Sequence, residues 1–264
     1  MRLLIGRILF FLAIVFAHNV VTAQSIVNTE KLFIDNGGGF AVSAELMGSS
    51  IQGNADVLLL EYSLNFAYKK AKNSFKLLSG GEYINENKQI VSNSLFSQLR
   101  YNYNFSEKSR LFAFAQIQSN AILLLERRLL GGAGYRQNII EKKKDTTRVF
   151  KIDLSAGIVQ EEELLNRTDL PVAEKYHTNY TRSVISLVGL FEVTDVITIV
   201  NTTYLQQYLK DFSDYRLLNE TNLMFAINDW LSLSLDLEYR FDSEPPSILK
   251  DTDFNTNFGL VFSL

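Results

Sequence analysis

The chain has 264 residues, of which 47% are hydrophobic and 21% charged, and it contains no cysteine. The high apolar fraction excludes a disordered or collagen-like chain, and the lack of cysteine excludes disulfides, thiol catalysis and cysteine-ligated metal sites. A formal net charge of −3 offers no basic excess for a nucleic-acid partner. No cofactor motif is found, so none is predicted.

Residues 1–23 have the organisation of a secretory signal peptide. Arginines precede an apolar run at 8–16, and a small-residue cleavage site ends at Ala23, before Gln24. The apolar run is about half of the roughly 20 residues that a spanning helix requires. We therefore predict cleavage between Ala23 and Gln24, export, and a short periplasmic lead segment at 24–38.

Apolar and polar residues alternate with period two along most of the remaining chain. From 231 to 242 the odd positions carry leucine, tyrosine and phenylalanine, and the even positions carry serine and charged residues. Successive side chains of a strand point to opposite faces of a sheet, so this pattern predicts strands rather than helices. Twelve strands are predicted, near 39–51, 55–69, 73–84, 88–105, 109–119, 127–140, 147–160, 179–192, 195–208, 214–227, 230–242 and 252–264.

The predicted fold class is all-β, an antiparallel transmembrane β-barrel of about 12 strands over residues 39–264. If the first strand runs outward, the two longest connections, 161–178 and 243–251, both lie outside, as in outer-membrane barrels. Aromatic residues near strand ends predict interfacial girdles: Tyr101, Tyr103, Phe105, Tyr204, Tyr208, Trp230, Tyr239 and Phe241. A soluble β-sandwich or lipocalin-like barrel is the alternative, and a barrel of ten or fourteen strands stays open.

The last predicted strand carries an alternating apolar ending. Phe258, Leu260, Phe262 and Leu264 share one face, and such an edge suits capture by strand addition. The ending resembles the membrane-insertion signal that the outer-membrane barrel assembly machinery reads, although that signal usually finishes on an aromatic residue rather than a leucine.

The face opposite the apolar stripes carries charges of both signs and is predicted to line the lumen. It comprises Glu61, Arg100, Arg128, Arg136, Lys151, Asp153, Arg182, Arg216, Glu220, Asp236, Glu238 and Arg240. An Arg or Lys facing lipid near the midplane costs roughly 2–4 kcal/mol, which favours this placement. We expect Arg100, Arg136, Arg216, Asp236 and Arg240 to set any selectivity. Strand number alone does not choose between charges that close the lumen and charges that line an aqueous path.

His177 is the candidate for catalysis, because it is the one histidine beyond the signal peptide. It lies in the longest outer loop near Asp169 and Glu174, but nothing fixes the geometry that a general base needs. We interpret it as a solvated loop residue and predict no catalytic residue. Carboxylates at Glu161, Glu162, Glu163, Asp242, Glu244, Asp251 and Asp253 lack the ligand spacing of a calcium loop, so they predict a solvated acidic rim and no metal site.

Several segments carry a family resemblance by their order along the chain. They are Ser50-Ile51-Gln52-Gly53-Asn54 as a Gly-Asn turn, the RRLLGGAGY segment from Arg127 to Tyr135, Asp214-Tyr215-Arg216, the segment from Tyr239 to Pro246, and Asp253. In this order they resemble the salt-induced outer-membrane protein family, classed as a domain of unknown function. The resemblance implies a barrel and no established activity.

The leading hypothesis is therefore an outer-membrane barrel, in contact with outer-membrane lipid and with both termini periplasmic, that is structural or forms a narrow passive channel. The resemblance adds a link to osmotic or salt response, while any ligand is unknown. Two alternatives remain, an envelope lipid-modifying enzyme that uses His177 and a binding or adhesion module built on loop 161–178.

Overall fold

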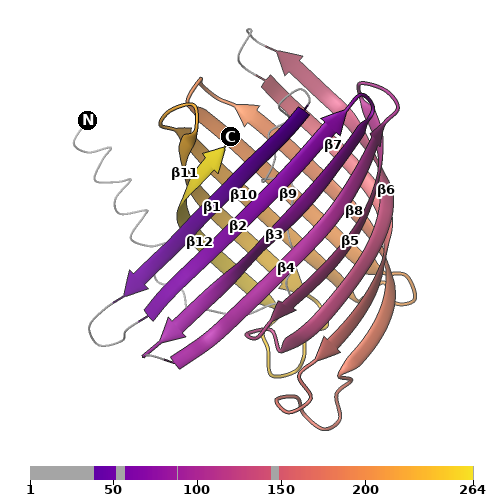
Figure 1. Ribbon diagram of the computed structural model, residues 1–264. Coiled ribbons are helices and arrows are strands. Elements are labelled where there is room, and N and C mark those ends of the chain that lie inside the picture. Colours follow the sequence, from indigo (N-terminus) through magenta and orange to yellow (C-terminus); the bar gives the residue numbers. More distant parts are fainter. Residues whose placement is uncertain (1–38, 52–56, 88, 144–148, 264) are drawn as a thin grey trace, which may run out of the picture.

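The computed structural model describes residues 39–51, 57–87, 89–143 and 149–263. Twelve antiparallel strands form one closed barrel, in which each strand pairs with its sequence neighbours and β1 pairs with β12 (Figure 1). This confirms the predicted fold class. The strands are β1 (Gly39–Ile51), β2 (Val57–Lys70), β3 (Asn73–Glu86), β4 (Gln89–Asn104), β5 (Ser109–Asn120), β6 (Leu125–Lys143), β7 (Val149–Leu165), β8 (His177–Glu192), β9 (Ile197–Tyr208), β10 (Tyr215–Ala226), β11 (Leu231–Asp242) and β12 (Thr252–Ser263). No helix in the described ranges is long and apolar enough to cross a membrane.

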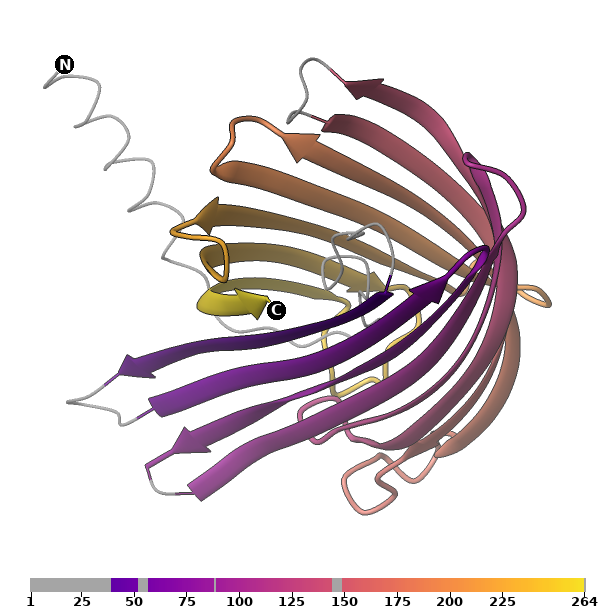
Figure 2. The same cartoon turned by 45° about the horizontal axis from the view of Figure 1, so that its top comes forward.

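The two ends of the barrel differ in their connections. One end, here the turn end, carries the start of β1, the end of β12 and short turns such as 71–72 and 105–108 (Figure 2). The other, here the loop end, carries the longest described connections, 166–176 and 243–251. The first of these loops is shorter than predicted, because β7 and β8 continue their pairing as far as Leu164 and His177.

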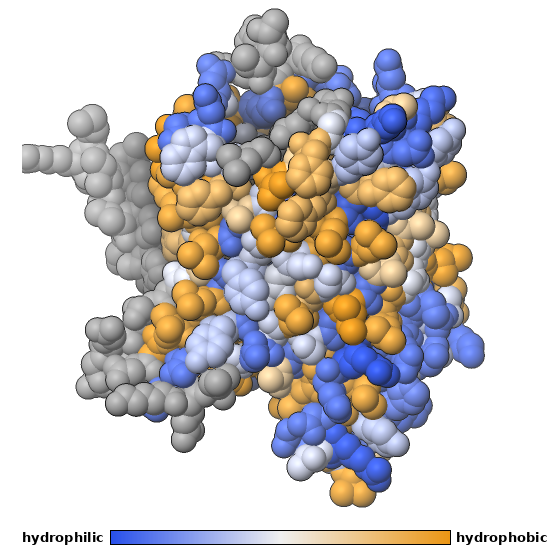
Figure 3. Space-filling model, viewed as in Figure 1, coloured by the Kyte–Doolittle hydropathy of each residue, from blue (hydrophilic) through white to orange (hydrophobic). Residues whose placement is uncertain are grey.

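The outward face of the barrel is apolar where a water-soluble protein would be polar. Leu99, Ile117, Ile158 and Phe258 are each about half exposed, at 57%, 49%, 58% and 54%. Apolar residues spread over the middle of the visible face, and hydrophilic residues gather toward its ends (Figure 3). An apolar surface of this extent is stable in lipid and not in water, so it argues against the soluble alternatives.

Aromatic side chains form a ring at the turn end. Neighbouring strands contribute stacked or tilted pairs, which are Phe40–Phe66, Phe75–Tyr101, Phe105–Tyr135, Phe150–Phe191 and Trp230–Phe262. Rings at this depth match the interfacial girdle of outer-membrane barrels. Two predicted girdle members are wrong: Tyr204 packs inside the barrel against a cluster containing Val159 and Val184, and Tyr208 lies inside beneath Arg182.

The barrel closes through a short seam, in which β1 pairs with β12 only over Ser43–Met47. Gly259 lies opposite Met47, and any β-carbon at 259 would collide with the Met47 side chain. Glycine at this position therefore allows the two strands to approach.

Candidate functional site: the barrel lumen

The interior of the barrel is polar, so the lumen rather than an apolar core is the candidate site. Most of the buried described residues are polar or charged, and the buried apolar ones form only small clusters. Buried charges are costly unless they are paired and hydrogen-bonded. How each charged group is satisfied therefore indicates what that part of the lumen does.

A network of buried ion pairs occupies one wall of the lumen at the loop end. Its centre is Arg216 on β10, whose Nη1 lies 2.9 and 3.0 Å from the two carboxylate oxygens of Glu161 on β7. The Arg216 Nε donates to Asp242 on β11 at 2.9 Å. Glu161 and Asp242 are 1% and 0% exposed, so these contacts are shielded from water. The contacts tie β7, β10 and β11 together across the lumen.

Two further arginines extend this network. Arg182 on β8 holds Asp214 with two hydrogen bonds, at 2.6 and 3.1 Å, and its Nε lies 3.5 Å from Glu161. Arg128 on β6 donates from Nε to Glu163 at 2.8 Å. The ion-pair network therefore comprises Arg128, Arg182, Arg216, Glu161, Glu163, Asp214 and Asp242.

The expected solvated rim at Glu161–Glu163 is therefore wrong for two of its three glutamates. Glu161 and Glu163 are odd-numbered residues of β7 and point into the lumen, where they are 1% and 3% exposed. Glu162 points outward. Asp242 and Asp253 are also buried, at 0% and 4% exposed. Pairing with arginine offsets the desolvation cost that makes isolated buried carboxylates unfavourable.

Beside the network, in the same half of the lumen, lies a cavity of about 140 Å³. Strands β1–β5 and β10–β12 line this acidic chamber. Its charged lining residues are Glu45, Glu61, Glu82, Glu220, Asp236, Glu238 and Arg240, which is six carboxylates and one arginine.

Several chamber carboxylates accept hydrogen bonds from neutral side chains. Asn257 Nδ2 donates to Glu61 at 2.6 Å, and Asn222 Nδ2 donates to Asp236 at 2.7 Å. The Ser234 hydroxyl donates to Glu45 at 3.2 Å. Amide and hydroxyl donors orient a carboxylate without adding positive charge to the wall. These contacts differ in kind from the arginine pairs of the ion-pair network. Glu238, in contrast, forms an ion pair with Arg240 at 2.8 Å.

A basic belt lies nearer the turn end, on β3–β6. It consists of Lys76, Arg100, Arg110 and Arg136. The Arg100 guanidinium lies over the rings of Phe112 and Phe114, at 5.0 and 5.9 Å from their centroids. Arg110 forms an ion pair with Asp153 at 3.2 Å. Between belt and chamber, Gln98, Gln116 and Gln118 form a hydrogen-bonded ladder on β4 and β5.

The five residues expected to set selectivity all lie inside the barrel, but in different regions. Arg216 belongs to the ion-pair network, Asp236 and Arg240 line the acidic chamber, and Arg100 and Arg136 belong to the basic belt.

Sequence reasoning did not select Glu45 or Glu82 for the lumen, although both line the chamber. The alternation of Glu45 with Ala44 and Leu46 could have identified Glu45. Glu82 follows Gly80 and Gly81, where the alternation is interrupted.

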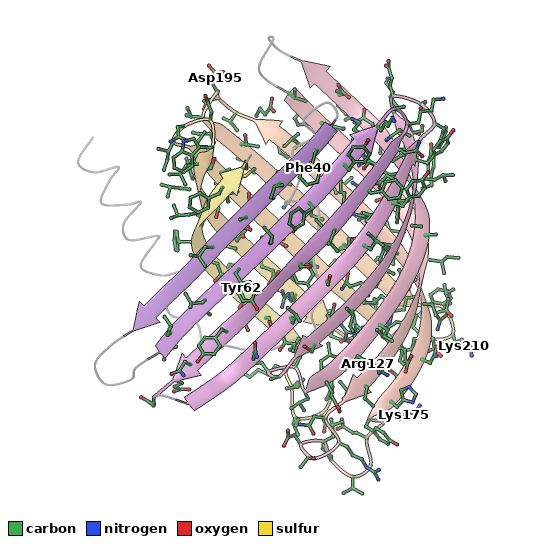
Figure 4. The ribbon with its side chains drawn as sticks, in the orientation of Figure 1. Phe40, Tyr62, Arg127, Lys175, Asp195 and Lys210 are labelled. Carbon is green, nitrogen blue, oxygen red and sulfur yellow. The ribbon has the colours of Figure 1, made fainter. Side chains whose placement is uncertain are left out.

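His177 lies on the outside of the barrel at the first residue of β8. Its Nε2 is 3.2 Å from Glu162 Oε1, and its side chain is 52% exposed. Arg127 shares the same Glu162 oxygen at 3.3 Å. Arg127, Lys175 and Lys210 lie at the loop end, whereas Phe40 and Asp195 lie at the turn end (Figure 4).

The loops at the loop end are held by their own contacts. Leu170 of loop 166–176 packs in a small apolar cluster with Leu123, Leu125 and Leu165. The Ser247 hydroxyl, on loop 243–251, donates a hydrogen bond to Glu174 on loop 166–176. In loop 209–214, the hydroxyl and then the backbone N–H of Ser213 donate to Asp211, which lowers the pKa of that carboxyl. No group of three or more metal-ligating side chains occurs among the residues described.

The predicted insertion residues Phe258, Leu260 and Phe262 lie on the outward face of β12 and are 54%, 37% and 36% exposed. Leu264, the cleavage pair Ala23 and Gln24, the signal peptide and the lead segment lie outside the described residues.

The family described as "Protein of unknown function, DUF481" matches residues 44–264. The chain belongs to this family. No curated protein matches the DUF481 chain.

Among solved structures, the DUF481 chain is similar to the COG4313 outer membrane channel from Pseudomonas putida F1. The two share 10% identity and a TM-score of 0.52, over 90% of this chain and 100% of that one. It is also similar to the NanC porin, with 8% identity and a TM-score of 0.50 over 85% and 98% of the two chains. At these identities the similarity shows the fold alone, which is that of outer-membrane barrels.

Proposed function

We propose that this DUF481 protein is a narrow passive channel of the bacterial outer membrane. One observation carries the proposal: arginine–carboxylate pairs tie part of the lumen together, while a cavity of about 140 Å³ lined by charged and amide side chains remains beside them. A purely structural barrel gains nothing from a charged cavity, whereas charged rings and walls select ions in channels.

Export by a signal peptide at 1–23 and insertion through β12 by the barrel assembly machinery belong to the same proposal, as does contact with outer-membrane lipid. A role in osmotic or salt response rests on the resemblance to the salt-induced outer-membrane proteins. The similarity to a channel and a porin supports the fold that such a role requires.

The test is single-channel recording from the protein in a planar lipid bilayer. We expect stable, discrete current steps, with detergent alone as the blank. The folded state is verified beforehand by its β-rich circular dichroism and by the emission of Trp230, the single tryptophan. Silence from protein shown to be folded would contradict the channel and favour a structural role.

A further inference from the structure

The strand register places like charges directly opposite each other at four positions in the lumen. Two of these pairs are acidic and lie in the chamber: Glu61 opposite Glu82, and Glu220 opposite Glu238. Like charges at directly opposed positions of an antiparallel sheet destabilise it. Arg240 forms an ion pair with Glu238 at 2.8 Å, but one arginine among six carboxylates leaves the lining of the cavity with an acidic excess. This excess calls for a reason other than folding.

The other two like-charge pairs are basic and form the belt. Lys76 lies opposite Arg100, and Arg110 lies opposite Arg136. The same arrangement thus recurs with the opposite sign, on the consecutive strands β3–β6.

The acidic and basic pairs are separated along the barrel. On β3, Glu82 lies four residues from the loop end of the strand and Lys76 three residues from its turn end. Six residues of extended strand separate them by about 20 Å. The glutamine ladder Gln98–Gln116–Gln118 runs between the two zones, so the wall is polar from one zone to the other.

We infer that the lumen is a bipolar, rectifying ion path, with a cation-attracting chamber toward the loop end and an anion-attracting belt toward the turn end. This inference rests on the proposed channel function and adds its selectivity. When the loop side is positive, cations enter through the chamber and anions enter through the belt, and both accumulate between them. With the voltage reversed, both ions are drawn away and the middle of the path is depleted. Current is therefore larger when the loop side is positive.

The effect depends on salt in a defined way. The Debye length is about 10 Å at 0.1 M salt and about 3 Å at 1 M. At 0.1 M the screening length far exceeds the width of the chamber, whereas at 1 M it is comparable to the distance from the wall to the centre, so the wall potential weakens and rectification fades as salt rises.

The experiment records current–voltage curves in symmetric KCl from channels of known orientation. The chain has no cysteine, so Val172→Cys, in the fully exposed part of loop 166–176, marks the loop side. A biotin–maleimide label and streptavidin added to one compartment then show which side faces it. At about 0.1 M KCl we expect the current with the loop side positive to exceed the reverse current by about twofold or more, and at about 1 M the two to be nearly equal.

Charge-removing variants identify the residues responsible. Glu61→Gln with Glu82→Gln, and separately Lys76→Gln with Arg100→Gln, should each reduce the ratio of the two currents toward one. Glu162→Gln and Arg127→Gln remove charges from the outside of the barrel and should leave the ratio unchanged. Folding is verified for each variant by the Trp230 emission.

The outcomes separate this inference from the channel itself. Current steps with a symmetric curve at low salt would overturn the bipolar path and leave the channel standing. Larger current with the loop side negative would overturn it as well. Silence from folded protein would overturn the channel and the inference with it.

Discussion

The ion-pair network and the acidic chamber lie in the same half of the lumen and share β10 and β11, yet the strand register sets different charges against each other in the two regions. In the network the register sets Arg216 against Asp242, whereas in the chamber it sets Glu61 against Glu82. The first arrangement compensates buried charge, and the second adds repulsion. The difference teaches that the buried charges of the network stabilise the barrel, whereas the charge register of the chamber costs it stability.

Removing the central arginine of the network should have the largest effect. Arg216→Met leaves Asp242, 0% exposed, without its ion pair and weakens the pairing of Glu161. We expect the free energy of unfolding to fall by about 3–5 kcal/mol. Equilibrium urea unfolding in lipid vesicles, followed by Trp230 fluorescence, measures it.

The matched control is Arg127→Met, which removes an arginine from a pair whose side chains are 47% and 36% exposed. It should cost less than about 1 kcal/mol, because water already screens the pair. Equal losses in the two variants would contradict the distinction between a shielded network and the rest of the barrel.

The basic belt should respond less strongly to loss of its carboxylate. Asp153 lies 3.2 Å from Arg110 and accepts a hydrogen bond from Asn138 at 2.9 Å. Asp153→Asn should reduce the free energy of unfolding by about 1–2 kcal/mol, since a charge-assisted hydrogen bond is lost. In the Asp153→Asn background, Arg110→Gln should cost less than it does alone. Simple additivity of the two changes would show that they do not interact.

A chamber variant should change stability in the opposite direction. Glu82→Gln removes a partly buried charge that lies opposite Glu61 in the strand register, and it keeps an oxygen that can accept from the Ser92 hydroxyl, now at 3.3 Å. We expect a gain of about 0.5–1 kcal/mol in the same urea experiment. A loss as large as that of Arg216→Met would mean that the chamber carboxylates are held as tightly as the network.

Sequence alone could predict the charge pairing in the acidic chamber better than that in the ion-pair network. The β2–β3 hairpin closes through a two-residue turn, so its register follows from the turn, and with it the pairing of Glu61 with Glu82. Period-two alternation likewise located all twelve strands. Alternation shows which charged residues face the lumen, and the turn of a short hairpin shows which residue on the next strand lies opposite each of them.

The contacts of the ion-pair network could not be predicted from the sequence, for physical reasons. Arg216 and Glu161 are 55 residues apart and lie on β10 and β7, so only the curvature of the closed barrel brings them together. Arg128 meets Glu163 only after β6 and β7 shift register between Asn138 and Ile140. Neither curvature nor an irregularity of register can be read from alternation, and the glutamates were therefore expected on a solvated rim.

The smallest effect is expected at His177, whose partner Glu162 adjoins two network glutamates in the chain but lies on the other face of the sheet. Glu162 stands between two network carboxylates in sequence, yet it points outward, where His177 Nε2 meets it at 3.2 Å. His177→Ala should change the free energy of unfolding by no more than about 0.5 kcal/mol and leave single-channel conductance unaltered, because the side chain is half exposed and faces away from the lumen. A changed conductance would place His177 in the ion path, and loss of an activity toward envelope lipid would revive the enzyme hypothesis. If neither occurs, the adjacent residues Glu161 and Glu162 of β7 differ in role: the inward carboxylate stabilises the barrel, and the outward one does not.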